Sequence, residues 1–112
     1  MKEYVLNLGF ENDQIYRGSA RTFLGDGRVR METHLVSALV IASANMTELL
    51  KKIPKSERGK LVLTGAVPPS FFLAAQSIIG SHFKEVEHFD GNKKVRYKIP
   101  PPPPASFQSE PV

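Results

Sequence analysis

The sequence predicts a single α/β domain with a mixed sheet, two helices, at least one parallel strand-helix-strand unit and an antiparallel hairpin at one edge. Three observations support this prediction. Strand and helix patterns alternate through the middle of the chain, and a short apolar strand at residues 60–64 leads through a glycine turn into a helix. Two further strand patterns flank a turn at residues 90–92. A chain of 112 residues has room for one domain, which we place at residues 1–99.

The first half of the chain contains two strand signals before its first helix. Residues 4–10 are short and apolar and end at a polar turn, which favours a buried strand. Residues 14–24 and 27–36 are typical of two strands of a hairpin, because Gly25, Asp26 and Gly27 supply the turn between them.

The next stretch, residues 35–42, suits either a buried strand or a short helix, and we favour a strand at residues 39–42. Asn45 has the side chain of a helix N-cap, with Glu48 three residues later, which predicts a helix over residues 46–53.

The second half has clearer signals. After the strand at residues 60–64, Pro68 and Pro69 are expected to open a helix, because proline lacks an N–H that the first helical turn leaves unpaired in any case. Gly80 is expected to end that helix in the left-handed conformation. Residues 84–89 and 94–99 then predict the last two strands.

Five consecutive prolines at residues 100–104 predict a polyproline II segment, since proline cannot donate to a sheet ladder. Together with the polar residues 105–112 they form a proline-rich tail. The tail is either a ligand for a proline-binding protein partner or a solvated extension.

Composition excludes several classes of function. The hydrophobic content of 41% and the charged content of 23% are those of a globular protein. The absence of cysteine excludes disulfides, thiolate nucleophiles and cysteine-based metal sites, and fits a reducing compartment. No stretch approaches the roughly 20 apolar residues of a membrane span, and no export signal is recognisable. We therefore expect a soluble, cytoplasmic protein.

The formal net charge of +4 favours an anionic ligand. The basic residues are spread along the chain rather than clustered, which argues against binding of a nucleic acid duplex. A basic strand face does occur near the end of the domain, at Lys93, Lys94, Arg96 and Lys98, and it is either a solvated surface or a contact for an anion.

The turn after the strand at residues 60–64 is the first candidate binding site. At the carboxyl end of a parallel strand, such a turn presents free N–H groups and a helix dipole to a ligand, and phosphate fits both. The alternative is a plain turn in which glycine and proline serve only the geometry. The residues concerned are Thr64, Gly65, Ala66, Val67 and Pro68.

A second turn follows the first predicted strand at Asn7 and Gly9. If the two strands lie parallel and adjacent, both turns meet at one edge of the sheet and form a crevice. An ordinary bend after an edge strand is the alternative.

The third candidate is the pair His82 and Asp90, which flank the strand at residues 84–89. A histidine and a carboxylate can hold a metal or supply general acid-base catalysis, whereas isolated histidines near helix ends more commonly cap the helix or lie on the surface. His88 shares a strand face with Asp90 by the two-residue period.

Residues 46–99 resemble the CRISPR-associated Rossmann-fold (CARF) domains and the related SAVED sensor domains, especially small stand-alone ring nucleases. The resemblance rests on the order Thr-Glu-Leu-Leu-Lys-Lys-Ile-Pro, then Gly-Lys-Leu-Val-Leu-Thr-Gly with Pro68 three residues later, then an apolar helix ending near His82 and a strand ending in Phe89 and Asp90.

The resemblance implies a Rossmann-like fold that binds a cyclic oligoadenylate second messenger in prokaryotic antiviral defence of the CRISPR type III kind, and that opens the ring if it is a nuclease. It implies that Ser70, with the turn at residues 65–68, meets phosphates or adenines. It further implies that His82 and Asp90 form a catalytic or metal-linked pair, with Mn²⁺ as the candidate metal, and that the protein is a homodimer around a two-fold symmetric ligand.

Two other functions remain open. One is an adaptor without catalysis that holds a protein partner by its sheet edge and its proline-rich tail. The other is a binder of single-stranded RNA that uses Tyr97 and the basic strand face.

Overall fold

The computed structural model describes residues 2–99 of the chain. Four strands form one mixed sheet in the order β1-β4-β5-β6, with β1 parallel to β4, β4 parallel to β5, and β6 antiparallel to β5. The strands are β1 (Glu3–Asn7), β4 (Lys60–Thr64), β5 (Glu85–Asp90) and β6 (Val95–Ile99). The predicted α/β class, the parallel strand-helix-strand unit and the antiparallel hairpin at one edge are therefore confirmed.

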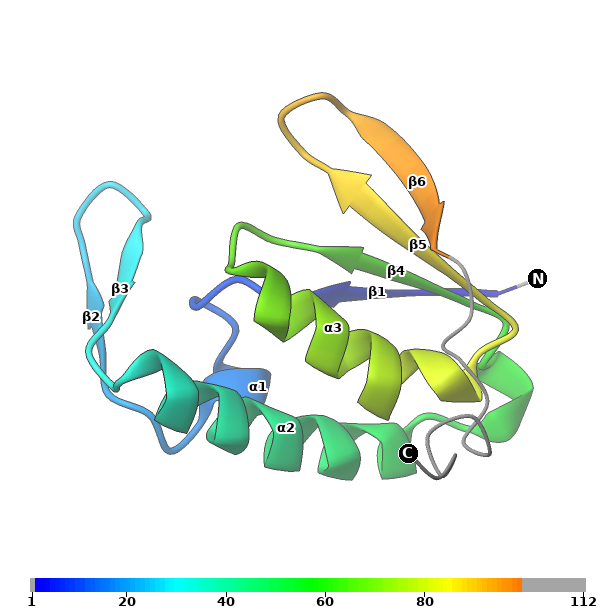
Figure 1. Cartoon of the computed structure of the whole chain (residues 1–112), viewed down its shortest axis with the longest axis horizontal. Coiled ribbons are helices and arrows are strands. Elements are labelled where there is room, and N and C mark those ends of the chain that lie inside the picture. Colours follow the sequence, from blue (N-terminus) through cyan, green and yellow to red (C-terminus); the bar gives the residue numbers. More distant parts are fainter. Residues whose placement is uncertain (1, 100–112) are drawn as a thin grey trace, which may run out of the picture.

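Within residues 2–99, three helices cover one face of this sheet and leave the other face free of helices, as Figure 1 shows. They are α1 (Asp13–Tyr16), α2 (Leu35–Lys52) and α3 (Pro69–Ile78), and short 3₁₀ turns follow at η1 (Lys55–Glu57) and η2 (Gly80–His82). None of the helices formed by the described part of the chain has the length and apolarity needed to cross a membrane. The predicted polyproline segment and the residues after it lie outside the described residues.

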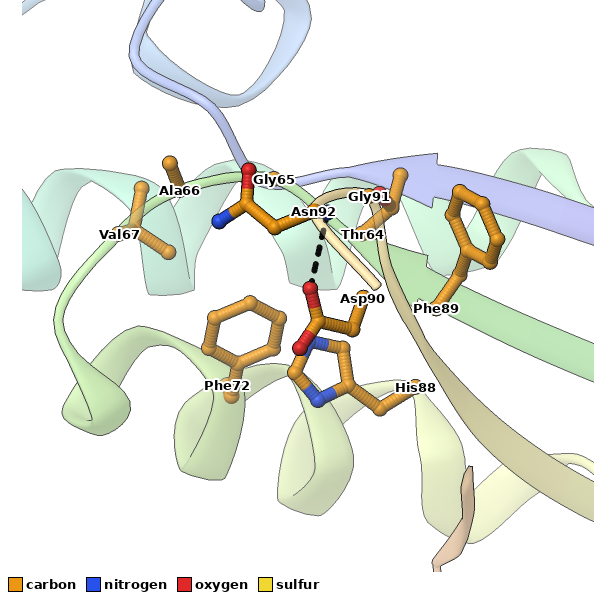
Figure 2. Close-up of a pocket in the computed structure, with 10 residues that line it drawn as sticks. All are labelled: Thr64, Gly65, Ala66, Val67, Phe72, His88, Phe89, Asp90, Gly91 and Asn92. Atoms are coloured by element: carbon orange, nitrogen blue, oxygen red, sulfur yellow. Dashed lines mark hydrogen bonds between the residues drawn. The ribbon is translucent and has the colours of Figure 1, made fainter. Parts of the chain in front are cut away.

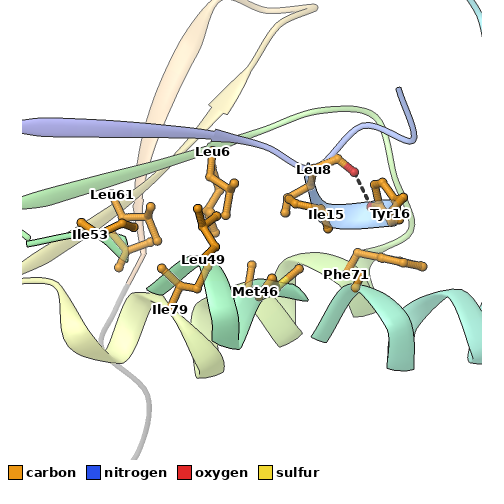
Figure 3. Packing of buried hydrophobic residues seen from close by; sticks show 14 of the residues in the cluster. Leu6, Leu8, Ile15, Tyr16, Met46, Leu49, Ile53, Leu61, Phe71 and Ile79 are labelled. Atoms are coloured by element: carbon orange, nitrogen blue, oxygen red, sulfur yellow. Dashed lines mark hydrogen bonds between the residues drawn. The ribbon is translucent and has the colours of Figure 1, made fainter. Parts of the chain in front are cut away.

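The core lies between the sheet and the helix layer (Figure 3). Alternate residues of β1 and β4, namely Leu6, Leu61 and Leu63, face the helices and are fully or almost fully buried. Tyr16 is also completely buried, and its hydroxyl donates a hydrogen bond to the carbonyl oxygen of Leu8. Burial in this apolar setting raises the pKa of the Tyr16 hydroxyl well above its ordinary value.

The predicted hairpin exists, but its strands are short. β2 (Arg21–Phe23) and β3 (Val29–Met31) pair with each other in a separate two-stranded sheet. The expected strand over residues 14–24 is wrong in its first part, because residues 13–16 form α1. The Asn12 side chain accepts a hydrogen bond from the N–H of Gln14 at 3.0 Å and so starts this helix.

The predictions for residues 35–53 are wrong in their boundaries. The strand expected at residues 39–42 and the helix expected from residue 46 are parts of one helix, α2, in which Ala38, Ala42, Met46 and Leu49 are buried at helical spacing. His34, whose side chain accepts a hydrogen bond from the N–H of Val36 at 3.3 Å, is the N-cap.

Asn45 is therefore not a helix cap. It lies inside α2, and its side-chain amide donates to the carbonyl oxygens of Ile15 at 2.6 Å and Arg17 at 3.0 Å. These two hydrogen bonds join α2 to α1, so the asparagine stabilises a contact between helices rather than a helix end.

Helix α3 begins as expected, with Pro68 at the N-cap and Pro69 as its first residue. Its predicted end is wrong, because Gly80 does not adopt a positive φ and the chain continues into η2. A Cβ atom at Gly80 would lie 3.1 Å from Cγ2 of Val86, so this glycine provides room for packing against β5.

The helix-free face of the sheet carries a charged network formed by Glu3, Lys60, Glu85, Glu87 and Arg96. Lys60 Nζ lies 3.2 Å from Glu87, and Arg96 Nη1 donates to Glu3 at 2.8 Å. The latter contact joins the two edge strands of the sheet, and it is possible because β5 and β6 turn steeply away from the direction of β1 and β4 (Figure 1). Arg96, expected on a basic strand face, is thus paired with carboxylates.

Candidate functional site

The turns that follow β1 and β4 lie against each other at the carboxyl edge of the sheet. Asn7 pairs with Thr64 at the ends of the two parallel strands, and the N–H of Leu8 donates to the carbonyl oxygen of Thr64 at 2.7 Å. The sequence-based condition for a shared crevice, that the two strands be parallel and adjacent, is therefore met.

Gly65 is required at this junction for two reasons. Its φ is +117°, a conformation that residues with a side chain rarely adopt. A Cβ atom here would also lie 2.6 Å from the backbone nitrogen of Gly9 and 2.8 Å from Oδ1 of Asn7. The close approach of the two turns thus depends on the absence of a side chain.

Asn7 and Gly9 shape the first turn. The N–H of Gly9 donates to Oδ1 of Asn7 at 2.8 Å, and Nδ2 of Asn7 donates to Glu11 at 3.0 Å. The carbonyl oxygen of Asn7 accepts from Nδ2 of Asn12 at 2.6 Å. The polar groups of Asn7 are therefore used within the turn, and neither Asn7 nor Gly9 lines the cavity described next.

A cavity of about 350 Å³ lies between the turn that joins β4 to α3 and the turn that joins β5 to β6 (Figure 2). This volume is near the lower limit of small-molecule sites, about 300 Å³. The lining residues come from both turns, from α3 and from the end of β5. They are Thr64, Gly65, Ala66, Val67, Phe72, His88, Phe89, Asp90, Gly91 and Asn92.

The β4–α3 turn lines the cavity and carries backbone N–H groups that can act as donors. Within residues 2–99, the N–H groups of Gly65, Ala66 and Val67 donate no hydrogen bond to another backbone group outside the regular elements. Pro68 and Pro69 have no N–H, and the N–H of Phe71 already donates to the carbonyl oxygen of Pro68 at 3.0 Å. The start of α3 therefore contributes few donors, and the turn before it contributes most of them.

Of the predicted ligand-binding residues, Thr64, Gly65, Ala66 and Val67 line the cavity, whereas Pro68 and Ser70 do not. Ser70 is exposed in the first turn of α3.

An aromatic pair forms one wall. The ring centroids of Phe72, from α3, and His88, from β5, are 4.5 Å apart with an interplanar angle of 46°. Phe72 lies beside the buried stripe of α3 formed by Phe71 and Ala75, and it is partly buried against the edge of the core while its ring contacts His88 of β5. On β6, Tyr97 lies directly opposite His88. The wall thus offers flat surfaces against which a planar ring can stack.

Asp90 organises the second turn. Its Oδ1 accepts hydrogen bonds from the N–H groups of Asn92 at 2.9 Å and Lys93 at 3.2 Å, and its carbonyl oxygen accepts from Lys94 at 2.7 Å. Figure 2 shows the first of these bonds and shows the second carboxylate oxygen directed toward the rings of Phe72 and His88.

His82 is not part of this site. It is exposed in η2, before β5 begins, whereas Asp90 is the last residue of that six-residue strand. Six extended residues span about 20 Å at 3.3 Å each. The histidine that lies close to Asp90 is His88, as the two-residue period of a strand indicates.

No group of three or more metal-binding side chains is present within residues 2–99.

Sequence reasoning missed several lining residues, namely Phe72, Phe89, Gly91 and Asn92. The signal for Phe72 was its angular position on the helix, about 100° from its neighbour Phe71. The signal for Gly91 and Asn92 was present as a turn, but a turn alone does not show which neighbouring loop it faces. That depends on the parallel pairing of β4 with β5.

No protein-family profile matches the chain, and neither a curated protein nor a solved structure matches it.

Proposed function

We propose that this chain binds a cyclic oligoadenylate second messenger of prokaryotic antiviral defence at the cavity on the carboxyl edge of its sheet, and that it does not cleave the ring. The observation that carries the proposal is the cavity itself, which combines the aromatic pair of Phe72 and His88 with N–H groups on the β4–α3 turn that have no backbone partner among residues 2–99. These are the two kinds of contact that a nucleotide requires, donors for its phosphate and a flat surface for its base.

Two further properties support an anionic nucleotide. The net charge of +4 attracts anions over a long range. The cavity also lies where ligands bind in open α/β sheets, at the carboxyl ends of adjacent parallel strands. The resemblance of residues 46–99 to the CARF and SAVED domains supplies the specific ligand class.

The size of the cavity supports a homodimer. A volume of about 350 Å³ accommodates one nucleotide unit rather than a ring of several. A cyclic ligand with two-fold symmetry presents identical units on opposite sides, and two copies of the chain related by the same axis would bind one unit each.

The separation of His82 from Asp90 supports binding without cleavage. A general acid or base must come within hydrogen-bonding distance of the group from which it takes or to which it gives a proton. With β5 between them, these two residues cannot act on the same phosphodiester. We therefore propose a sensor or sink rather than a ring nuclease.

The proposal is tested by isothermal titration calorimetry with cyclic tri-adenylate and cyclic tetra-adenylate. We expect binding of at least one ring at micromolar concentration, with a stoichiometry of one ring per two chains. No heat of binding with either ring contradicts the proposal. Equal affinity for linear oligoadenylate favours a binder of single-stranded RNA instead.

Chromatography of the ligand after incubation, with and without Mn²⁺, tests the second part of the proposal. We expect intact ring in both samples, and a linear product that depends on the protein would contradict binding without cleavage.

A pair of neighbouring residues on α3 provides a matched control for the location. Phe72→Ala removes part of the aromatic wall and should weaken binding at least about fivefold, since stacking of one base contributes about 1–3 kcal/mol. Leu73→Ala changes a side chain that is 65% exposed and lies outside the cavity, so it should leave affinity unchanged. Equal effects of the two substitutions would place the ligand elsewhere.

A further inference from the structure

We infer that Asp90 selects the base of the bound nucleotide by accepting a hydrogen bond from its exocyclic amino group. This inference rests on the proposed function, and it gives Asp90 a role in specificity rather than in catalysis.

The two oxygens of the Asp90 carboxylate have different surroundings. Oδ1 is used within the β5–β6 turn, where it accepts from the N–H groups of Asn92 and Lys93. Oδ2 forms no hydrogen bond or ion pair with any residue in the range 2–99, and it is directed toward the rings of Phe72 and His88 (Figure 2). One oxygen therefore holds the turn and leaves the other available to a ligand.

The carboxylate also fixes the orientation of a nucleotide in the cavity. A phosphate next to Asp90 would place two negative charges together, whereas the N–H groups of Gly65, Ala66 and Val67 on the opposite turn suit an anion. The phosphate therefore belongs at the β4–α3 turn and the base at the aromatic wall. In this orientation the edge of the base faces Asp90.

A carboxylate oxygen only accepts hydrogen bonds, so it favours a base with a donor at that edge. Adenine, with its exocyclic amino group, provides a donor. Hypoxanthine has the same purine shape but carries a carbonyl oxygen in place of the amino group and a hydrogen on N1, so an acceptor would face the carboxylate at the position of the amino group. The cavity should therefore discriminate between two ligands of the same shape that differ only at C6 and N1 of the purine.

The substitution Asp90→Asn separates the two functions of the side chain. The asparagine oxygen can still accept from the N–H groups of residues 92 and 93, so the turn is retained. The group directed at the ligand changes from an acceptor to an NH₂ donor. Asp26→Asn is the matched control, because Asp26 accepts from the N–H of Arg28 at 3.1 Å in the β2–β3 turn and does not line the cavity.

The experiment measures the affinities of cyclic tetra-adenylate and cyclic tetra-inosinate for the full chain and the two variants by calorimetry. The unchanged protein and Asp26→Asn should bind the adenine ring at least about fivefold more tightly than the inosine ring, the discrimination of one good hydrogen-bonded contact. Asp90→Asn should lose or reverse this preference.

The outcomes separate this inference from the proposed function. Equal affinity of the unchanged protein for both rings overturns the role of Asp90 and leaves ring binding intact, and this comparison holds even if Asp90→Asn fails to fold. An unchanged preference in a folded Asp90→Asn variant overturns the role of Asp90 as well. Failure to bind either ring overturns the proposed function and the inference with it.

Discussion

Replacing Gly65 with alanine tests the close approach of the two turns at the candidate site. At φ +117° a side chain adds backbone strain of about 1–3 kcal/mol. The new Cβ would also lie 2.6 Å from the backbone nitrogen of Gly9, about 1 Å closer than an ordinary contact between heavy atoms. Because that neighbour is backbone, the β1 turn itself must move, at a cost of about 1–3 kcal/mol.

Together these effects predict a loss of about 2–6 kcal/mol from a total free energy of unfolding of about 5–15 kcal/mol. For a domain of this size the melting temperature should fall by at least about 8 °C. Urea denaturation followed by far-ultraviolet circular dichroism measures the loss, and a thermal scan measures the change in melting temperature.

Gly27→Ala is the control that separates strain from crowding. Gly27 also has a positive φ, +86°, but no atom lies within 4 Å of its Cβ position. Its replacement should therefore cost about 1–2 kcal/mol from strain alone. If the two variants lose the same stability, the contact between the turns has no energetic importance and our reasoning about the junction is refuted.

Three further predictions concern groups away from this junction. Tyr16→Phe should lower the free energy of unfolding by about 1–3 kcal/mol in urea denaturation, because it leaves the buried carbonyl of Leu8 without its donor, and the exposed Tyr97→Phe should have little effect. Asn45→Ala should lower the free energy of unfolding by about 1–3 kcal/mol in the same assay, because the carbonyls of Ile15 and Arg17 lose their donor. A loss of stability no larger than that of Thr47→Ala, on the exposed face of α2, would contradict a bridging role for Asn45. The hydrogen bond from Arg96 holds the pKa of Glu3 below its ordinary value of 4.5, so this carboxylate stabilises the fold above pH 4.5, and its contribution is lost as the pH falls through the lower pKa of the folded state. The midpoint of urea denaturation, measured from pH 7 to pH 3, should therefore decrease, and the decrease should be smaller in Arg96→Leu. Equal decreases in the two proteins would contradict the pairing.

The strands and turns of the second half could be predicted from the sequence because their signals are local. The strand at residues 60–64 ends at Gly65, and two prolines open the following helix, so each boundary is marked by residue types that few conformations allow. The hairpin at residues 90–92 is marked in the same way.

Helix α2 could not be delimited because its strongest local signal is misleading. Asn45 followed by Glu48 has the pattern of a helix start, yet the asparagine side chain donates a hydrogen bond to the carbonyl oxygen of Ile15, which lies 30 positions earlier in the sequence. The correct signal was the periodic series Ala38, Ala42, Met46 and Leu49, which extends across the expected boundary.

Only part of the candidate site could be predicted, because the rest depends on contacts between segments that are distant in the sequence. The β4–α3 turn is recognisable from its own residues, but its neighbours in the cavity are set by strand order. Because β5 pairs with β4, the turn at residues 90–92 faces Gly65. That His88 rather than His82 lies beside Asp90 follows from the two-residue period of β5, so this part of the site was available from the sequence.

Within residues 2–99, the helix-free face of the sheet is covered by the charged network rather than by helices. Val62 alternates with Leu61 and Leu63 and so lies on the face without helices, yet it is only 2% exposed. The long side chains that reach across the sheet, above all Arg96 toward Glu3, can cover apolar surface with their aliphatic stems while their charged ends pair.

A protein that docked flat on this face would have to separate these ion pairs or remove them from water, at a cost that its own contacts would have to exceed. The network therefore disfavours the binding of another protein to the helix-free face of the sheet. In the homodimer that we propose, the network would direct two copies toward the carboxyl edge, where the cavity lies.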